Sequence, residues 1–339
     1  MPSTPRTHRE VRLAAVPDGL PRPEHFTVVQ APVPQPGPGE VLVRNRAFLV
    51  FAALLRTMIG AAAAGLPGPR PGDPLPGPAI GEVITAPEAG GLRPGDLVRH
   101  DFGWREYATV PAGMCSPLGD TLPDPVAHLS QGWTAYAALT RAAEVRPGDT
   151  VLVTGAAGAV GSLAGQTARL LGAGRVIGTT GSAAKAYRLT TELGYDAAVV
   201  RGPEPVTRQL AHSAPEGIDV LLDTVGGEQL RAAVEVARPH ARFALVGALS
   251  AQLAAEGRGI SAPVELDLAP IVVKRISLRG LNAADHPDAL DEWTQRFGGW
   301  LRAGDIRFPH VRLPGIDQAP EAFRQVAEGR HVGAVIVEL

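Results

Sequence analysis

Residues 150–162 read TVLVTGAAGAVGS, and a change of pattern within this stretch decides the fold. An apolar, β-branched run ends at Thr154 and is followed by glycines at positions 155, 158 and 161. The overlapping segment 159–172 then has apolar side chains at helical spacing. A strand, a glycine turn and a helix in direct succession predict a βα unit that presents backbone N–H groups to an anion.

Each of the three glycines has a physical role in such a turn. Gly155 permits the tight turn, Gly158 lets the backbone approach a pyrophosphate, and Gly161 allows close packing of the helix. The dipole of the helix adds to the attraction for phosphate, which favours dinucleotide binding. The alternative is a tight turn without a ligand, because loops rich in glycine and alanine are common in this composition.

The alternation of strand and helix continues along the chain and predicts a parallel sheet wrapped by helices. Six strands match a doubly wound nucleotide-binding sheet of the Rossmann type. The expected strands are 150–155, 175–181, 197–200, 219–226, 242–248 and 276–282. The expected helices are 159–172, 183–194, 206–214 and 228–238.

The first 120 residues have a different pattern, with short strand-like runs bounded by turn residues. The expected strands there are 26–34, 40–50, 79–88, 96–100 and 106–112. Segment 66–78 holds six prolines in thirteen residues, which predicts a loop. The tail should form a helix over 287–306, a second helix and a last strand over 333–339. We expect this tail to fold back on the β-rich part.

Composition and charge exclude several classes of function. The formal net charge is −2 and the basic residues are scattered, which argues against nucleic acid as a partner. No run reaches the ~18 apolar residues of a membrane span. The first residues, MPSTPRTHRE, lack the apolar core of a secretory signal, so we expect a cytoplasmic protein. A single cysteine, Cys115, excludes an internal disulfide and a multi-thiolate zinc site.

The end of the second expected strand indicates which dinucleotide binds. NAD-binding sheets usually carry an acid there, whereas this chain has Thr180, Gly181, Ser182 and Lys185. Hydroxyl groups and a cation suit the 2′-phosphate of NADP, and Arg201 at the end of the third strand is a candidate second cation. The alternative for both cations is an ordinary solvated surface position.

Several quoted stretches resemble one family across nearly the full chain. GWTAYAAL (132–139), VRPGDTVLVTGAAGAVGSLAGQTARLLGAGRVIGTTGS (145–182), GIDVLLDTVGG (217–227) and RFALVGALS (242–250) resemble the medium-chain dehydrogenase/reductase superfamily. The resemblance is to its zinc-independent branch, which holds leukotriene hydroxydehydrogenase, prostaglandin reductase and alkenal double-bond reductases.

This resemblance implies an α/β fold in which a GroES-like β-rich domain is joined to a Rossmann doubly wound parallel sheet. The implied boundaries are 1–124 for the GroES-like part, 125–290 for the NADP-binding domain and 291–339 for the C-terminal return. NADPH is implied in the cleft between them. A homodimer pairing through residues 275–282 is the expected assembly, and a small enone or enal the expected substrate.

The resemblance also implies a set of cofactor-binding residues. Thr134 would lie near the nicotinamide, residues 246–250 along the cofactor, and residues 281–283 beside the carboxamide. Thr224 and His331 stand where the family has asparagine, and Arg201 where it often has tyrosine. The implied set is Thr134, Gly155, Ala157, Gly158, Ala159, Val160, Ser182, Lys185, Arg201, Thr224, Val246, Gly247, Leu249, Leu281, Asn282, Ala283 and His331.

Zinc-dependent relatives carry a Gly-His-Glu motif and a four-cysteine lobe. The corresponding stretch here, PAIGEVITAPEAG (78–90), has no histidine before Glu82, so no metal is expected. Without zinc to polarise an alcohol, reduction of an activated C=C bond is the more natural reaction. Hydride would reach the β-carbon of an enone or enal, and donors would stabilise the enolate.

One segment departs from the family. VFAALLR (50–56) keeps Arg56 but has Leu54 where the branch has a tyrosine, so the usual phenolic donor is missing. We therefore name no catalytic acid. The candidates to replace it are Tyr107, Tyr136, Asn282, Asp285 and His286. The candidate substrate-binding residues are Leu54, Arg56, Trp104 and His286, with Trp133 as a further candidate wall.

The leading hypothesis is an NADPH-dependent enone or enal reductase. The same scaffold also allows a cyclase, dehydratase or other tailoring enzyme without net redox chemistry, because of the altered segment 50–56. A quinone reductase and an NADPH-binding protein with little catalysis are the remaining alternatives.

Overall fold

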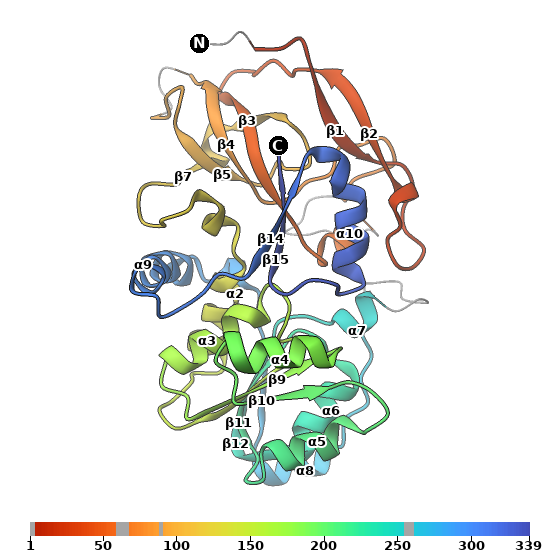
Figure 1. Ribbon diagram of the computed structural model, residues 1–339, viewed down its shortest axis with the longest axis vertical. Coiled ribbons are helices and arrows are strands. Elements are labelled where there is room, and N and C mark those ends of the chain that lie inside the picture. Colours follow the sequence, from red (N-terminus) through yellow and green to blue (C-terminus); the bar gives the residue numbers. More distant parts are fainter. Residues whose placement is uncertain (1–3, 59–67, 88–90, 254–260) are drawn as a thin grey trace. The chain divides into compact units, whose positions relative to one another are not determined.

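The computed structural model describes residues 4–58, 68–87, 91–253 and 261–339. Its contacts divide the chain into two compact units (Figure 1). Unit 1 holds the chain up to Leu129 together with His310–Arg330 and Ala334–Leu339. Unit 2 holds Ser130–Pro309 and His331–Gly333.

Unit 2 is built around a six-stranded sheet in which every paired neighbour is parallel. The strand order is β10-β9-β8-β11-β12-β13, the doubly wound order. The strands are β8 Thr150–Val153, β9 Arg175–Thr180, β10 Ala197–Val200, β11 Ile218–Asp223, β12 Ala237–Leu245 and β13 Ser277–Gly280. All six were predicted from the sequence, and the predicted α/β fold is confirmed.

Helices cover both faces of this sheet because its strands are apolar on both sides. Val151 and Val153 of β8 pack with α2, α3 and α4, whereas Leu152 packs with α5 and α6 on the other face. The helices are α2 Gly132–Ala137, α3 Gly161–Leu170, α4 Ala183–Glu192, α5 Val206–Ser213, α6 Gly227–Glu235, α7 Leu249–Gln252, α8 Leu268–Lys274 and α9 Pro287–Ala303. A π-helical turn, Ala138–Ala142, continues α2, and a 3-10 turn, Ala283–Asp285, follows β13.

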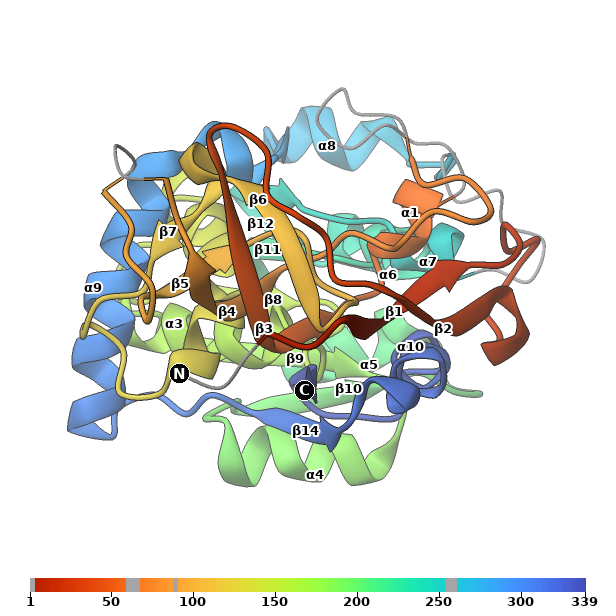
Figure 2. The ribbon, with the colours of Figure 1, turned by 90° about the horizontal axis from the view of Figure 1, so that it is seen from above.

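Unit 1 is mainly antiparallel. Its larger sheet has the order β14-β15-β3-β4-β5-β7, with β6 paired to β3, and a separate ribbon joins β1 and β2 (Figure 2). The strands are β1 Thr7–Leu13, β2 Phe26–Pro32, β3 Glu40–Val50, β4 Ala79–Thr85, β5 Leu97–His100, β6 Tyr107–Pro111, β7 Ser116–Pro117, β14 His310–Pro314 and β15 Ala334–Glu338. The helices are α1 Leu54–Met58 and α10 Ala319–Ala327, and 3-10 turns cover Pro23–His25, Ala112–Met114, Pro125–Leu129 and Ile316–Gln318.

The boundaries between the units differ from the expected ones. Unit 2 begins at Ser130 instead of residue 125, and it keeps α9, which was expected to start the C-terminal return. The reason is close packing of α9 on α2. A Cβ atom on Gly132 would lie 2.0 Å from the Trp293 ring, and the Tyr136 hydroxyl donates to Glu292 Oε2 at 2.8 Å. The return to the β-rich unit begins at His310, and β15 pairs with β3.

Cys115, the only cysteine in the sequence, lies in the core of unit 1. Its side chain packs among valines of β3, β4, β5 and β6, and it is 9% exposed. Burial raises the pKa of the thiol to about 11. The described residues contain no group of three or more His, Cys, Asp or Glu placed to hold a metal ion.

His100 at the end of β5 is a second buried titratable group. Its side chain is 1% exposed, and its Nδ1 accepts a hydrogen bond from the backbone N–H of Phe102 at 3.1 Å. Its Nε2 has no partner among the described residues. Burial, and then the positive charges of Arg105 and Arg99, lower the pKa of His100 to about 3.

We therefore predict a pH-dependent loss of stability that originates at His100. Between about pH 6.5 and pH 3 the unfolded chain binds a proton that the folded chain does not, so the free energy of unfolding falls by about 1.4 kcal/mol per pH unit. His100→Asn keeps an acceptor for Phe102 and should show a smaller fall between pH 7 and pH 5 in urea unfolding. His212→Asn, which removes an exposed histidine of α5, is the control. Equal falls in wild type and His100→Asn would contradict the prediction.

Candidate functional site

The carboxyl ends of the six parallel strands meet at one edge of the unit 2 sheet. The chain runs outward from β8 through β9 to β10 on one side, and from β11 through β12 to β13 on the other. The strand order therefore reverses between β8 and β11. Open α/β sheets bind ligands at this switch point, and the turn after β8 is the glycine loop.

The geometry of the loop matches the three roles predicted for its glycines. Gly155 has φ +60°, and a Cβ atom there would lie 2.7 Å from Thr224 Oγ1. A Cβ atom on Gly161 would lie 2.5 Å from the Gly155 carbonyl oxygen. Gly158 is exposed, so the backbone at the middle glycine is open to a ligand. The loop thus combines a tight turn, an open backbone and a closely packed helix.

The loop also has free hydrogen-bond donors. In the part of the chain that the structure describes, the N–H groups of Ala157 and Val160 donate to no acceptor, whereas the Ala159 N–H faces the Gly333 carbonyl in the β-bridge between Gly158 and Gly333. Unpartnered N–H groups at the start of a helix attract an anion, because the helix dipole adds to their partial charges. This set of donors fits a pyrophosphate group.

Two neighbouring helices that begin at the same edge have their first turns occupied by side chains. Ser182 caps α4 by accepting from the Lys185 N–H, and Asp223 accepts from the N–H groups of Val225 and Gly226 before α6. The start of α3, at Val160, has no side-chain cap.

The ends of β9 and β10 bring the expected cation site together. Ser182 and Lys185 are half-buried at the start of α4, and the Arg201 N–H donates to the Thr180 carbonyl at 2.9 Å. Arg201 Nη2 lies 3.2 Å from where a Cβ atom on Gly181 would be. Burial, and then the charge of Arg201, lower the pKa of Lys185. Two cations without an acid at the end of β9 fit a phosphate.

Residues after β11, β12 and β13 line the same edge. The N–H groups of Val246 and Gly247 donate to the Asp223 carbonyl, and the Leu249 N–H donates to the Thr224 carbonyl. The Leu281 N–H donates to the Leu245 carbonyl at 2.9 Å. The structure therefore brings these predicted cofactor residues to one edge. The neighbours of Leu281 are Asn282, which caps the following 3-10 turn, and Ala283, which is buried.

Thr224 is hydrogen-bonded to Thr154. Its hydroxyl donates to the Thr154 carbonyl at 3.0 Å, and its N–H donates to Thr154 Oγ1 at 2.9 Å. The Thr224 side chain therefore binds the backbone of Thr154, the residue that directly precedes the glycine loop. The place of Thr224 among the cofactor-binding residues stays a prediction.

Two further predicted residues, Thr134 and His331, also belong to unit 2. Thr134 is half-buried on α2, and His331 is half-buried in the short segment His331–Gly333. The Gly333 N–H donates to the Ala157 carbonyl at 2.9 Å, and Gly333 forms a β-bridge with Gly158. The segment that carries His331 therefore lies directly against the glycine loop.

Gly333 itself was missed in the sequence. It has φ +86°, and a Cβ atom there would lie 1.9 Å from the Pro309 carbonyl oxygen. Asp223 and Thr154 were also missed as functional residues. The signal for both was their position, because each follows an apolar run at the end of one of the two strands that flank the switch point.

Two of the candidate substrate-binding residues, Trp104 and Leu54, are buried in the structure. Trp104 has 0% exposure and packs among Phe26, Phe48 and Phe323 in the core of unit 1, so its predicted place in a pocket wall is wrong. Leu54 is 1% exposed and also belongs to the buried residues. Arg56 is exposed and stays a candidate.

The remaining candidates for contact with the substrate are a histidine that follows β13 and two tyrosines. His286 is half-buried and begins α9. Tyr136 is 2% exposed, and its hydroxyl already donates to Glu292. Tyr107 is buried on β6 against His8. Neither tyrosine is an open phenolic donor within its own unit.

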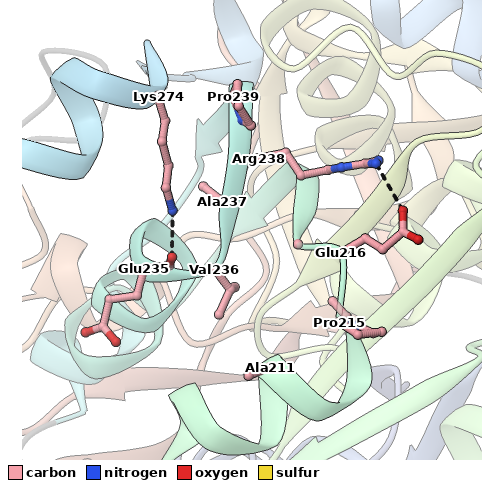
Figure 3. Close-up of a pocket in the computed structure, with 11 residues that line it drawn as sticks. Ala211, Pro215, Glu216, Glu235, Val236, Ala237, Arg238, Pro239 and Lys274 are labelled. Atoms are coloured by element: carbon pink, nitrogen blue, oxygen red, sulfur yellow. Dashed lines mark hydrogen bonds and ion pairs between the residues drawn. The ribbon is translucent and has the colours of Figure 1, made fainter.

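A separate hollow of about 290 Å³ lies where β11 and β12 begin, and Figure 3 draws the residues that line it. Its two cations already have partners. Lys274 Nζ donates to the Glu235 carbonyl at 2.7 Å, and Arg238 pairs with Glu216 at 3.3 Å and Asp219 at 3.2 Å. This hollow lies at the opposite edge of the sheet from the glycine loop and has no part in the candidate site.

Two family models match the chain, and together they cover most of it. A model described as zinc-binding dehydrogenase matches residues 159–297, and one described as the N-terminal domain of oxidoreductase matches residues 9–118. The chain belongs to the medium-chain dehydrogenase/reductase superfamily. The name of the first model implies zinc, but the described residues hold no fitting set of ligands, and the buried Cys115 keeps its proton.

Individual members of the superfamily are similar over almost the whole chain. The NADPH-dependent curcumin reductase of Escherichia coli (strain K12) is 28% identical over 96% of this chain and 95% of its own. Prostaglandin reductase-3 of Mus musculus is 29% identical over 91% and 83%. The crystal structure of CurA from Vibrio vulnificus in complex with NADPH has a TM-score of 0.87 at 28% identity, covering 97% and 98%. This medium-chain dehydrogenase/reductase is an NADP-dependent oxidoreductase. In the described residues, no helix is both long and apolar enough to cross a membrane.

We predict that Lys185→Ala weakens NADPH binding by roughly 1–3 kcal/mol, the range of a hydrogen bond to a charged group, and barely changes NADH binding. Titration of each cofactor, followed by its fluorescence, measures both constants. The sequence holds only two lysines, so Lys274→Ala is the matched control. Equal losses for NADPH and NADH in Lys185→Ala would reject a role at the 2′-phosphate.

Proposed function

We propose that the protein reduces the C=C bond of an α,β-unsaturated ketone or aldehyde at the expense of NADPH. The observation that carries the proposal is the carboxyl edge of the unit 2 sheet, where open loop amides and the Lys185–Arg201 pair are suited to NADPH. Relatives named curcumin reductase, prostaglandin reductase-3 and 2-alkenal reductase support the enone or enal as substrate.

Different residues of the chain would bind different groups of the cofactor. The N–H groups of Ala157 and Val160 would hold the pyrophosphate, and Ser182, Lys185 and Arg201 the 2′-phosphate. When bound, NADPH supplies the hydride that reaches the β-carbon of the substrate. The remaining predicted residues would fix the orientation of the nicotinamide, because hydride transfer needs the reacting atoms aligned.

Charge that develops on the substrate carbonyl oxygen needs hydrogen-bond donors. Leu54 supplies none, and the hydroxyl of Tyr136 is engaged by Glu292. This departure from the branch is the one observation that favours a second candidate, a tailoring enzyme that uses the scaffold without net redox chemistry. The two functions differ in whether product formation consumes NADPH.

The test is an assay with NADPH deuterated at C4 and a panel of enones and enals. We predict loss of absorbance at 340 nm, one product per NADPH consumed, and deuterium at the β-carbon by mass spectrometry and NMR. Matched saturated ketones should give no turnover. Deuterium on the carbonyl carbon, or product formed without NADPH consumption, would reject the proposed reaction.

We further propose that two copies pair through the outer edge of the unit 2 sheet. Strand β13 is the last strand on that side, and the preceding helix α8 exposes Leu268 at 69% and Val272 and Val273 at 72% each. An open strand edge beside exposed apolar side chains is a surface that another chain can cover. A second copy would extend the sheet across a two-fold axis.

Light scattering after size exclusion tests this assembly. We predict a mass of twice 35.3 kDa for the wild type and 35.3 kDa for Val272→Asp combined with Val273→Asp. Tyr187→Asp alters another exposed apolar side chain, on α4 and 68% exposed, and should stay dimeric. A dimer that persists in the α8 variant would place the interface elsewhere.

A further inference from the structure

Asp223, the last residue of β11, is a carboxylate buried at the switch point of the sheet. It is 1% exposed and forms no ion pair in the described chain. Burying an unpaired carboxylate costs several kcal/mol unless hydrogen bonds replace the lost water. The Asp223 carboxylate therefore needs hydrogen-bond donors within the protein, and the identity of these donors indicates its role.

The donors come from both strands that flank the switch point. Thr154 Oγ1 donates to Asp223 Oδ1 at 2.5 Å, and the N–H groups of Val225 and Gly226 donate to the same oxygen at 2.9 and 3.0 Å. Hydrogen bonds to an ionised acceptor are about twice as strong as neutral ones. The carboxylate thus joins the end of β11 to the end of β8.

The link continues from Thr154 to the glycine loop. Because the Thr154 hydroxyl donates to Asp223, its lone pairs face the N–H of Thr224, which donates to it at 2.9 Å. The Thr224 hydroxyl in turn lies 2.7 Å from where a Cβ atom on Gly155 would be. Thr224 therefore leaves no room for a side chain at the first glycine, and the place of Thr224 depends on its hydrogen bonds to Thr154, whose hydroxyl is held by Asp223.

We infer that Asp223, acting through Thr154, is a positioning residue for the dinucleotide. The carboxylate fixes the hydroxyl of Thr154, which fixes the turn that carries the open N–H groups of Ala157 and Val160. This inference rests on the proposed role of that loop in holding the pyrophosphate. It is independent of the substrate, because it concerns cofactor binding alone.

Because Asp223 carries a negative charge, the direction in which Asp223→Asn changes cofactor affinity tests the inference. If the carboxylate were only a nearby anion, it would repel the pyrophosphate, and Asp223→Asn would tighten cofactor binding. If the carboxylate positions the loop, Asp223→Asn removes the charge that strengthens the hydrogen bonds to Oδ1, and it puts an NH2 group where Oδ2 accepts from the Gly226 N–H at 3.1 Å, so binding weakens. The two roles therefore predict opposite changes.

The experiment measures NADPH and NADH dissociation constants for four variants, namely Asp223→Asn, Thr154→Val, Thr154→Ser and the Thr154→Val/Asp223→Asn pair. We expect about a tenfold loss for Asp223→Asn and for Thr154→Val. The loss should be equal for both cofactors, because they share the pyrophosphate. Thr154→Ser, which keeps the hydroxyl, should stay within about threefold of wild type, and the double variant should bind no more weakly than Asp223→Asn.

Hydrogen exchange in the cofactor-free protein gives a readout independent of activity. Peptides that span residues 155–161 should exchange faster in Thr154→Val than in Thr154→Ser, while peptides from β3 and β15 stay unchanged. Tighter binding by Asp223→Asn, or equal binding by Thr154→Val and Thr154→Ser, would overturn the inference. If Asp223→Asn does not fold, the comparison of Thr154→Val with Thr154→Ser tests the inference by itself. Wild-type protein that fails to bind NADPH would instead reject the proposed function.

Discussion

The close approach of α3 to the turn that precedes it is the constraint on which the site depends. A Cβ atom on Gly161 would lie 2.5 Å from the Gly155 carbonyl oxygen and 2.6 Å from the Ala156 Cα atom. Neighbouring elements reinforce this approach. The Tyr195 hydroxyl donates to the Gly161 carbonyl at 2.6 Å, and its ring fills the space that Gly165 leaves. The helix therefore starts directly over the end of β8, with its first amides turned to the loop.

Much of the fold follows from local pattern. Most strands of unit 2 contain a short apolar run, and their alternation with helices predicts a parallel sheet. Strand β1 escaped prediction because His8 and Glu10 are buried in it, so its inward face does not look apolar. The end of unit 2 was misplaced because the packing of Trp293 on Gly132 joins positions far apart in the sequence.

Some residues of the candidate site could likewise be predicted from the local sequence, and others could not. The glycine loop and the Lys185–Arg201 pair were predictable because each follows a strand directly. Trp104 and Leu54 were not, since burial depends on neighbours that sequence spacing does not identify. The hydrogen bonds of Asp223 and Gly333 connect distant parts of the chain, and no local pattern marks them. What sequence analysis finds is the set of donors, whereas their supports appear only in three dimensions.

Cys115 has a consequence for the chemistry that the protein is proposed to perform. Enones and enals are Michael acceptors, and they alkylate thiolates far faster than thiols. With its pKa near 11 and its side chain among valines, this thiol is almost fully protonated and shielded at neutral pH. A catalyst of this design has no other sulfhydryl to lose, so reactive substrate can accumulate without self-alkylation at cysteine.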